Sequence, residues 1–144
     1  MAVNTNAVGK TYAPLTYAVG REKIREYAYA TGERDPRCLD VEKAREAGYA
    51  DLLAPPMFAA VYCGPAIGPA ILDPEVGIDF SRMVHGAQEF TWHEPVVAGD
   101  EITTEAELDE QSERGGLQFY VFKTTSKNQR GELVCEGRWT NIVR

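Results

Sequence analysis

The chain has 144 residues, 44% of them hydrophobic and 26% charged, which predicts one globular domain over residues 1–144, since two cores of half this size would each be marginal. The formal net charge of −7 argues against a nucleic acid partner, which needs a basic face, and against an anionic membrane surface. No apolar run reaches the ~18 residues of a membrane span. The N-terminus lacks the pattern of a signal peptide, and three widely spaced cysteines argue against a disulfide framework, so we expect a cytoplasmic protein.

The first part of the chain is predicted to be mainly helical. Residues 1–10 are small and polar and are expected to be loose, and residues 11–19 form a short extended segment at a sheet edge. Apolar residues spaced i, i+3, i+4 and i+7 predict a helix over residues 20–31, and capping residues at both ends predict a shorter helix over residues 40–47.

The most apolar stretch, residues 52–71, is predicted to contain a buried helix. Its body covers residues 57–63, and Gly64-Pro65 is expected to end or kink it, because proline has no backbone N–H and its ring crowds the preceding turn. A helix that is apolar on all sides is typical of a helix buried on all sides.

From Met83 onward the hydrophobic period changes to two, which is typical of strands. The pattern predicts one strand from Met83 to His93 and three more over residues 102–113, 117–127 and 133–143, with tight turns between the last three. Helices followed by an antiparallel meander indicate an α+β fold with the sheet wrapped on a central helix. Such a sheet has edge strands, which often pair across a dimer.

Few residues offer an obvious chemistry. The chain has no phosphate-binding loop, no paired-cysteine zinc spacing and no serine nucleophile elbow, so we expect no metal. His85 and His93 are the two histidines, the residue type most used for proton transfer, and their even spacing puts them on one strand face but ~26 Å apart. Glu33 and Asp35 could exchange protons if burial raised a pKa, but turn and capping roles are simpler, and Cys38 is simplest as a structural thiol.

Three stretches together resemble the MaoC-like hydratase/dehydratase family. They are residues 27–38 (YAYATGERDPRC), 47–60 (AGYADLLAPPMFAA) and 84–100 (VHGAQEFTWHEPVVAGD), and their order and spacing fit the family over most of the chain. The third stretch is most similar to N-terminal-type MaoC domains, which include the substrate-binding subunits of two-subunit (3R)-hydroxyacyl-thioester dehydratases.

The resemblance implies a single hotdog domain, an antiparallel sheet around one long helix, that assembles as a homodimer or as a heterodimer with a catalytic MaoC-type hotdog subunit. It implies that water is added or removed across the 2,3 bond of an acyl thioester on coenzyme A or acyl carrier protein, with no metal or redox cofactor. Such a reaction needs a proton-transfer group and a donor that stabilises charge on the thioester oxygen.

The family's active motif reads Ser/Thr-Gly-Asp-x-Asn-Pro-x-His, and this chain departs from it. Glu33 stands where the catalytic Asp stands, Asp35 at the Asn position and Cys38 at the catalytic His position. Moving a group by about 1 Å can cost ~10²-fold in rate, and losing the acid–base group costs ~10²–10⁴-fold. The positions that match are Thr31, Gly32 and Pro36.

A second departure lies at the start of the central helix. Active members carry His-Gly there, with a backbone N–H facing the thioester oxygen, whereas this chain has Pro55-Pro56, and proline has no N–H. Losing such a donor costs ~3 kcal/mol. We therefore expect a poor dehydratase that serves as the acyl-binding partner of a subunit with an intact Asp/His dyad. The residues expected to line or support the acyl channel are Met57, Phe58, Val61 and Tyr62.

Two alternatives stay open. The chain could be a self-sufficient homodimeric dehydratase with a relocated dyad, His85 with Glu33 or Asp35. It could also be a hotdog thioesterase or an acyl-binding protein without chemistry, because one fold hosts several activities.

Overall fold

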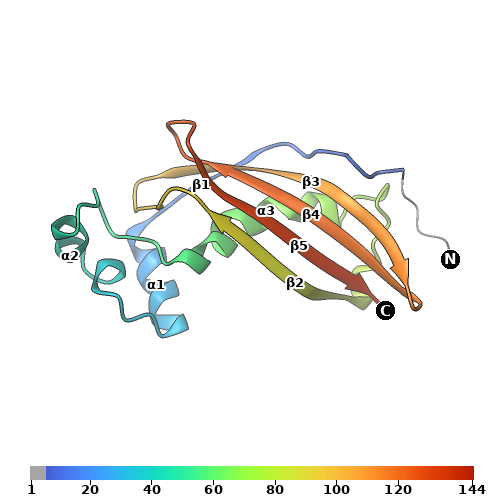
Figure 1. The fold of residues 1–144 in the computed structure, drawn as a ribbon, viewed down its shortest axis with the longest axis horizontal. Helices are drawn as coiled ribbons and strands as arrows, with labels where there is room; N and C mark the ends of the chain where they lie inside the picture. The colour runs from blue at the N-terminus through green and yellow to red at the C-terminus, as the bar shows by residue number, and fades with distance from the viewer. Residues whose placement is uncertain (1–5) are drawn as a thin grey trace.

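A computed structural model describes residues 6–144. One five-stranded sheet curves along α3, while α1 and α2 lie beyond one end of it (Figure 1). The strands pair antiparallel in the order β1-β3-β4-β5-β2, which confirms the α+β prediction of an antiparallel sheet against a central helix. The strands are β1 (Leu15–Ala18), β2 (Met83–Trp92), β3 (Glu101–Arg114), β4 (Leu117–Lys127) and β5 (Leu133–Val143); the helices are α1 (Arg21–Thr31), α2 (Val41–Glu46) and α3 (Ala59–Ile71), with 3₁₀ turns η1 (Pro36–Cys38), η2 (Pro56–Phe58) and η3 (Phe80–Arg82).

Capping residues fix the end of α1 and the start of α2 close to the predicted positions. Gly32 follows α1 with φ 72°, a left-handed conformation that favours glycine, and its N–H bonds the carbonyls of Ala28 and Tyr29. Asp40 precedes α2 and accepts a hydrogen bond from the N–H of Glu42 at 2.8 Å. These local interactions explain why both helices could be predicted to within about a residue at each end.

The central helix α3 is longer and less buried than predicted. It continues through Pro65 and Pro69 to Ile71, so the expectation that Gly64-Pro65 could end it is wrong. Both prolines lie on the exposed side of α3, where carbonyls that lose an N–H partner can bond water. The helix buries one side only, with Leu72 just beyond its end 71% exposed.

The sheet is covered unevenly. Helix α3 packs mainly against β3, with fewer contacts to β4 and β1. In the described part of the chain β2 pairs with β5 alone, so its other edge is free. Every residue of β2 is exposed or half-buried, although the strand carries Phe90 and Trp92. A free ten-residue edge of this kind is a ready place for another strand to pair.

A bulge in β2 places the two histidines on opposite faces of the sheet. The register between β2 and β5 shifts between His85 and Ala87, so one extra residue interrupts the alternation. His85 lies opposite the buried Asn141, whereas His93 bonds the exposed Glu136, which points to the other face of β5. The prediction that both histidines share a face is therefore wrong, because one added residue inverts every side chain after it.

The N-terminal segment is partly ordered. Residues 1–5 lie outside the described part of the chain, but residues 6–10 pack against the domain, contrary to the expectation that they are loose. Ala7 is 5% exposed, the N–H of Gly9 donates to the carbonyl of Leu108 at 2.8 Å, and the N–H of Leu108 donates to the carbonyl of Lys10 at 3.0 Å. No helix within residues 6–144 is long and apolar enough to cross a membrane.

Candidate functional site

A pocket of about 530 Å³ lies where the loop after α1 meets the segment after β2. Side chains from residues 33–38 and Tyr49 form one wall, which we call the loop wall. Residues 92–96, at the end of β2, form the opposite strand wall. Residues 53–56 and Tyr62 of α3 line the pocket between the two walls. The pocket thus brings together Glu33, Asp35 and Cys38, which are close in sequence, with groups more than fifty residues away.

Glu33 and Asp35 of the loop wall are engaged in the structure of their own loop. One oxygen of Glu33, Oε1, accepts hydrogen bonds from the N–H groups of Arg34 at 2.9 Å and Asp35 at 3.0 Å. The Asp35 carboxylate caps η1 and pairs with Arg37, whose Nε and Nη2 approach it to 3.0 and 2.6 Å. These bonds to Arg37 lower the pKa of Asp35, so that this carboxyl stays ionised and paired.

Cys38 is a buried thiol rather than a reactive one. It is 2% exposed, and burial, together with the nearby charges of Asp35 and Glu33, raises the pKa of the Cys38 thiol to about 11. A thiol with this pKa is protonated at neutral pH and is neither a base nor a nucleophile. The loop wall therefore has no free imidazole at the position where the family motif carries one.

Pro55 and Pro56 present no N–H group to the pocket. Their carbonyl groups are used instead: Pro55 accepts from the N–H of Phe58 at 2.9 Å, and Pro56 accepts from the indole Nε1 of Trp92 at 2.7 Å. The Trp92 bond ties the strand wall to the start of α3. Developing negative charge on a ligand oxygen would find no backbone donor on either proline.

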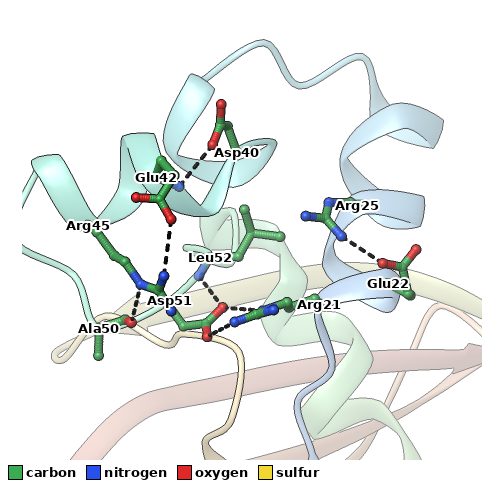
Figure 2. A network of polar contacts seen from close by, with 9 residues as sticks. All are labelled: Arg21, Glu22, Arg25, Asp40, Glu42, Arg45, Ala50, Asp51 and Leu52. Carbon is green, nitrogen blue, oxygen red and sulfur yellow. Dashed lines mark hydrogen bonds and ion pairs between the residues drawn. The ribbon is translucent and has the colours of Figure 1, made fainter.

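The loop wall is held in place by a polar network around Asp51, seen in Figure 2. Arg21 of α1 donates to both carboxylate oxygens of Asp51, each at 2.8 Å, and Asp51 also accepts from the N–H of Leu52 at 2.7 Å. The Arg21 guanidinium lowers the pKa of Asp51 to about 2. On the other side Arg45 of α2 bonds the carbonyl of Ala50. The network joins α1 and α2 to the segment directly after Tyr49 of the loop wall.

Of the four residues expected to line an acyl channel, the pocket contains Tyr62. Phe58 is fully buried beneath it, in ring contact with Tyr62, Tyr17 and Tyr27 at centroid distances of 6.3, 6.3 and 5.6 Å. Met57 is 48% exposed and Val61 is half-buried, and both lie outside the pocket. Phe58 thus supports the pocket without facing it.

The pocket contains His93 and not His85. The ring of His85 packs edge-on against Trp139 at 6.0 Å between centroids, away from Glu33 and Asp35. His93 lies on the strand wall, and its Nε2 is 2.9 Å from Oε2 of Glu136. Sequence reasoning gave His93 no role, because the bulge and the pairing with β5 leave no local signal; its place two residues before Pro95 at the end of a strand was the available hint.

A second pocket, of about 390 Å³, adjoins the first. The two share Tyr49, Glu94 and Pro95, and the second continues towards Asp100 and the β4–β5 turn at residues 129–130. The site is thus a cleft with two compartments. Within residues 6–144 no group of three or more His, Cys, Asp and Glu side chains could hold a metal ion.

Comparison with known proteins gives a consistent picture. The family described as "FAS1-like, dehydratase domain region" matches residues 6–137. A UPF0336 protein of Saccharopolyspora erythraea is 40% identical over 145 residues, which cover 100% of this chain and 93% of that protein.

Two solved structures are similar over nearly the whole chain. One is a chain of the C-terminally truncated HadBC (3R-hydroxyacyl-ACP dehydratase) complex from Mycobacterium tuberculosis, with 29% identity, a TM-score of 0.83 and coverage of 97% of this chain and 99% of that one. The other is a MaoC-like dehydratase, with 29% identity, a TM-score of 0.88 and coverage of 96% of this chain and 42% of that one.

Proposed function

The chain belongs to the FAS1-like dehydratase-region family and has its MaoC-like hotdog fold, and on this basis we propose that it is the acyl-binding subunit of a (3R)-hydroxyacyl-thioester dehydratase or enoyl hydratase. In this role it holds an acyl thioester, carried on coenzyme A or acyl carrier protein, in the pocket beside α3. The chemistry is performed by a partner hotdog subunit that carries an intact Asp/His dyad.

The observation that supports this proposal is a pocket that contains the positions of the family motif, where the side chains present are used for hydrogen bonds of their own loop or are buried. Glu33 and Asp35 hold backbone N–H groups and Arg37, and the thiol of Cys38 has a raised pKa. The two prolines at the start of α3 offer no oxyanion donor. Hydration of an enoyl thioester needs a proton-transfer group and such a donor; the loop wall lacks the imidazole of the motif, and the prolines lack the N–H.

The pocket is suited to binding. Its volume of about 530 Å³ falls within the usual ~300–1,000 Å³ of small-molecule sites. Apolar side chains from Leu53, Pro55, Tyr62 and Val96 line it beside a few polar groups. An acyl chain fits such a lining because burial of each CH₂ contributes ~0.8 kcal/mol without a specific polar contact.

The free edge of β2 supports a hotdog partner. The edge is ten residues long, and large apolar side chains lie exposed near both of its ends: Phe80 is 62% exposed and Trp92 is 46% exposed. A second sheet that pairs there would complete the backbone hydrogen bonds of β2 and cover these side chains. The similar HadBC chain comes from a structure described as a complex.

The alternative, a self-sufficient homodimer, would need His85 from a second copy. Within one chain His85 lies outside the pocket, and the carboxylates of Glu33 and Asp35 are engaged. A homodimer paired through β2 is the arrangement that could bring a second His85 towards the cleft, so the test must include this possibility.

The test measures hydration of crotonyl thioesters by absorbance, with the chain alone and with a MaoC-type hotdog subunit that carries the Asp/His dyad. We expect no hydration by the chain alone, calorimetric binding of butyryl-pantetheine, and activity when both subunits are present. Glu33→Gln and Cys38→Ala should leave the activity of the pair within about threefold. Robust activity of the chain alone that His85→Ala abolishes would establish the homodimer instead, and release of free thiol would establish a thioesterase.

A further inference from the structure

The pocket beside α3 is charged where it is open and uncharged where it is buried. Its charged lining residues are half-buried or exposed: Glu33, Asp35, Arg37 and Glu94. Its buried lining residues carry no charge, and we call the part of the pocket that they line the base: Cys38, Ala54, Pro55, Tyr62 and Val96. An acyl chain gains free energy where its surface leaves water, so its tail belongs at the base, and its thioester and carrier belong at the open side.

Tyr62 is the one residue of the base with a large side chain. The other four have short side chains, whereas Tyr62 brings an aromatic ring from α3. In a helix the side chain forms most of the surface that a residue presents to its surroundings. Because Tyr62 lines the pocket and is only 2% exposed, its ring lies at the deep end of the pocket rather than on its rim.

The ring of Tyr62 is supported by fully buried neighbours. Phe58, one turn earlier in α3, contacts it with 6.3 Å between ring centroids. Cys135 of β5 and Cys63 of α3 lie next to it and are both 0% exposed. Burial, with these two thiols beside it, raises the pKa of the Tyr62 hydroxyl, so the side chain stays neutral. A ring packed among such neighbours has little room to move aside.

We propose that the ring of Tyr62 sets the greatest length of acyl chain that the pocket accepts, and that this limit lies below ten carbons. A chain that reaches the ring can go deeper only by displacing packed side chains, which is unfavourable. Further CH₂ groups then stay at the open side in contact with water. The inference rests on the proposed function, since it concerns the ligand of the same pocket, and it adds chain length to the acyl class.

The limit below ten carbons follows from the size of the pocket. Its volume of about 530 Å³ must hold the thioester and the adjoining part of the carrier as well as the acyl tail. Up to the limit, each additional CH₂ should tighten binding about fourfold, because it leaves water for an apolar surface. Beyond the limit, additional CH₂ groups should tighten binding by less than about twofold each.

The experiment measures calorimetric binding of butyryl-, hexanoyl-, octanoyl- and decanoyl-pantetheine to the full chain. For the wild type we expect affinity to rise with length and then to level off before decanoyl. Tyr62→Ala should let the rise continue, because the lost ring leaves an apolar cavity that a longer chain can fill. The ratio of decanoyl to butyryl affinity should therefore increase at least tenfold in this variant.

Three further variants keep the test independent of a loss of stability. Tyr62→Leu removes less volume than Tyr62→Ala and should shift the limit in the same direction by a smaller amount. Tyr62→Phe keeps the ring and should keep the limit of the wild type. Val61→Ala is the matched control, because Val61 is the preceding residue of α3, is half-buried and lies outside the pocket. It should leave the dependence on chain length unchanged.

The outcomes separate this inference from the proposed function. Wild-type affinity that rises by the same factor at every step to decanoyl overturns the limit and leaves the acyl-binding proposal standing. A limit that survives in folded Tyr62→Ala or Tyr62→Leu, or that is lost in Tyr62→Phe, overturns the role of the ring. An equal loss of affinity for all four compounds in Tyr62→Ala also overturns it, because that result indicates a structural role. Binding of none of the compounds by a folded wild-type chain overturns the proposed function and this inference together.

Discussion

The two walls of the pocket use their polar side chains differently. On the loop wall Glu33 and Asp35 bond the N–H groups of the loop and the guanidinium of Arg37. On the strand wall the Nε2 of His93 lies 2.9 Å from Oε2 of Glu136 on the neighbouring strand β5. The loop wall carries the positions of the family motif, yet its carboxylates bond groups of their own loop. A match in position therefore does not establish that a residue performs the chemistry of that position.

The difference follows from which groups accept hydrogen bonds from the backbone N–H groups of each wall. The loop after α1 has N–H groups without helix or strand partners, and short carboxylate side chains bond them, as in turns generally. The strand wall adjoins β5, which accepts the N–H of His93 through the carbonyl of Val134. A side chain can bind a ligand where no backbone N–H group requires it as a hydrogen-bond acceptor.

The largest effect should come from the buried ring of Phe58, which packs on Tyr62 of the pocket. Phe58→Ala removes a fully buried ring that packs on Tyr62 and Tyr27, and it should lower the free energy of unfolding by about 3–5 kcal/mol. Urea unfolding measures the loss. Its neighbour Met57, 48% exposed, is the control, and Met57→Ala should change stability by less than about 1 kcal/mol. Equal losses in the two variants would contradict the placement of Phe58 beneath the pocket.

The network that holds the loop wall should make stability depend on acid pH. Arg21 lowers the pKa of Asp51 to about 2, below the ~3.9 of an unfolded chain. The carboxylate therefore stabilises the fold above about pH 4, and this contribution is lost as the pH falls through about 2.

Asp51→Asn should lower the free energy of unfolding by about 1–2 kcal/mol at pH 7, through loss of the ion pair and of the cap on Leu52, and should flatten the dependence between pH 4 and 2. Urea midpoints across pH 2–7 measure both effects. Glu22→Gln is the control, because Glu22 pairs with Arg25 on the exposed face of α1 and should change little. A variant with the full acid dependence of the wild type would show that Asp51 is not its source.

A smaller effect is expected where the strand wall is joined to the start of α3. Trp92→Phe keeps an aromatic ring but loses the hydrogen bond to the carbonyl of Pro56, at a cost of about 0.5–1.5 kcal/mol. Because the bond fixes the strand wall relative to α3, the affinity for butyryl-pantetheine should fall about two- to fivefold. Calorimetry measures this, with His85→Phe on the same strand as the control. Unchanged affinity would mean that the hydrogen bond does not shape the pocket.

The smallest effect is expected at the motif position on the loop wall. The pKa of Cys38 is raised to about 11, so the thiol is neutral between pH 6 and 9. Cys38→Ala should leave the affinity for butyryl-pantetheine within about twofold and independent of pH over that range, because a small neutral group replaces another. Calorimetry at several pH values checks this. A pH-dependent loss of binding in the variant would indicate that the thiolate takes part.

Much of the fold could be predicted because its signals are local. The strands over residues 117–127 and 133–143 coincide with β4 and β5, since period-two alternation is strong wherever one face of a strand is buried. The end of α3 was missed because Pro65 breaks a helix by local rules, yet its exposed position makes it tolerable here. Which of four apolar residues would face the pocket also had no local signal, since Phe58 and Tyr62 differ only in what packs around them.

The sequence by itself determined what chemical groups the chain brings to its site. It excludes an imidazole at Cys38 and an N–H at Pro55 and Pro56, and no tertiary arrangement can restore either. Only the tertiary structure decided that His93, and not His85, reaches the pocket. That choice depends on one bulge in β2 and on pairing with a strand more than forty residues later. Register between distant strands is an energy of the whole sheet, which no short stretch of sequence encodes.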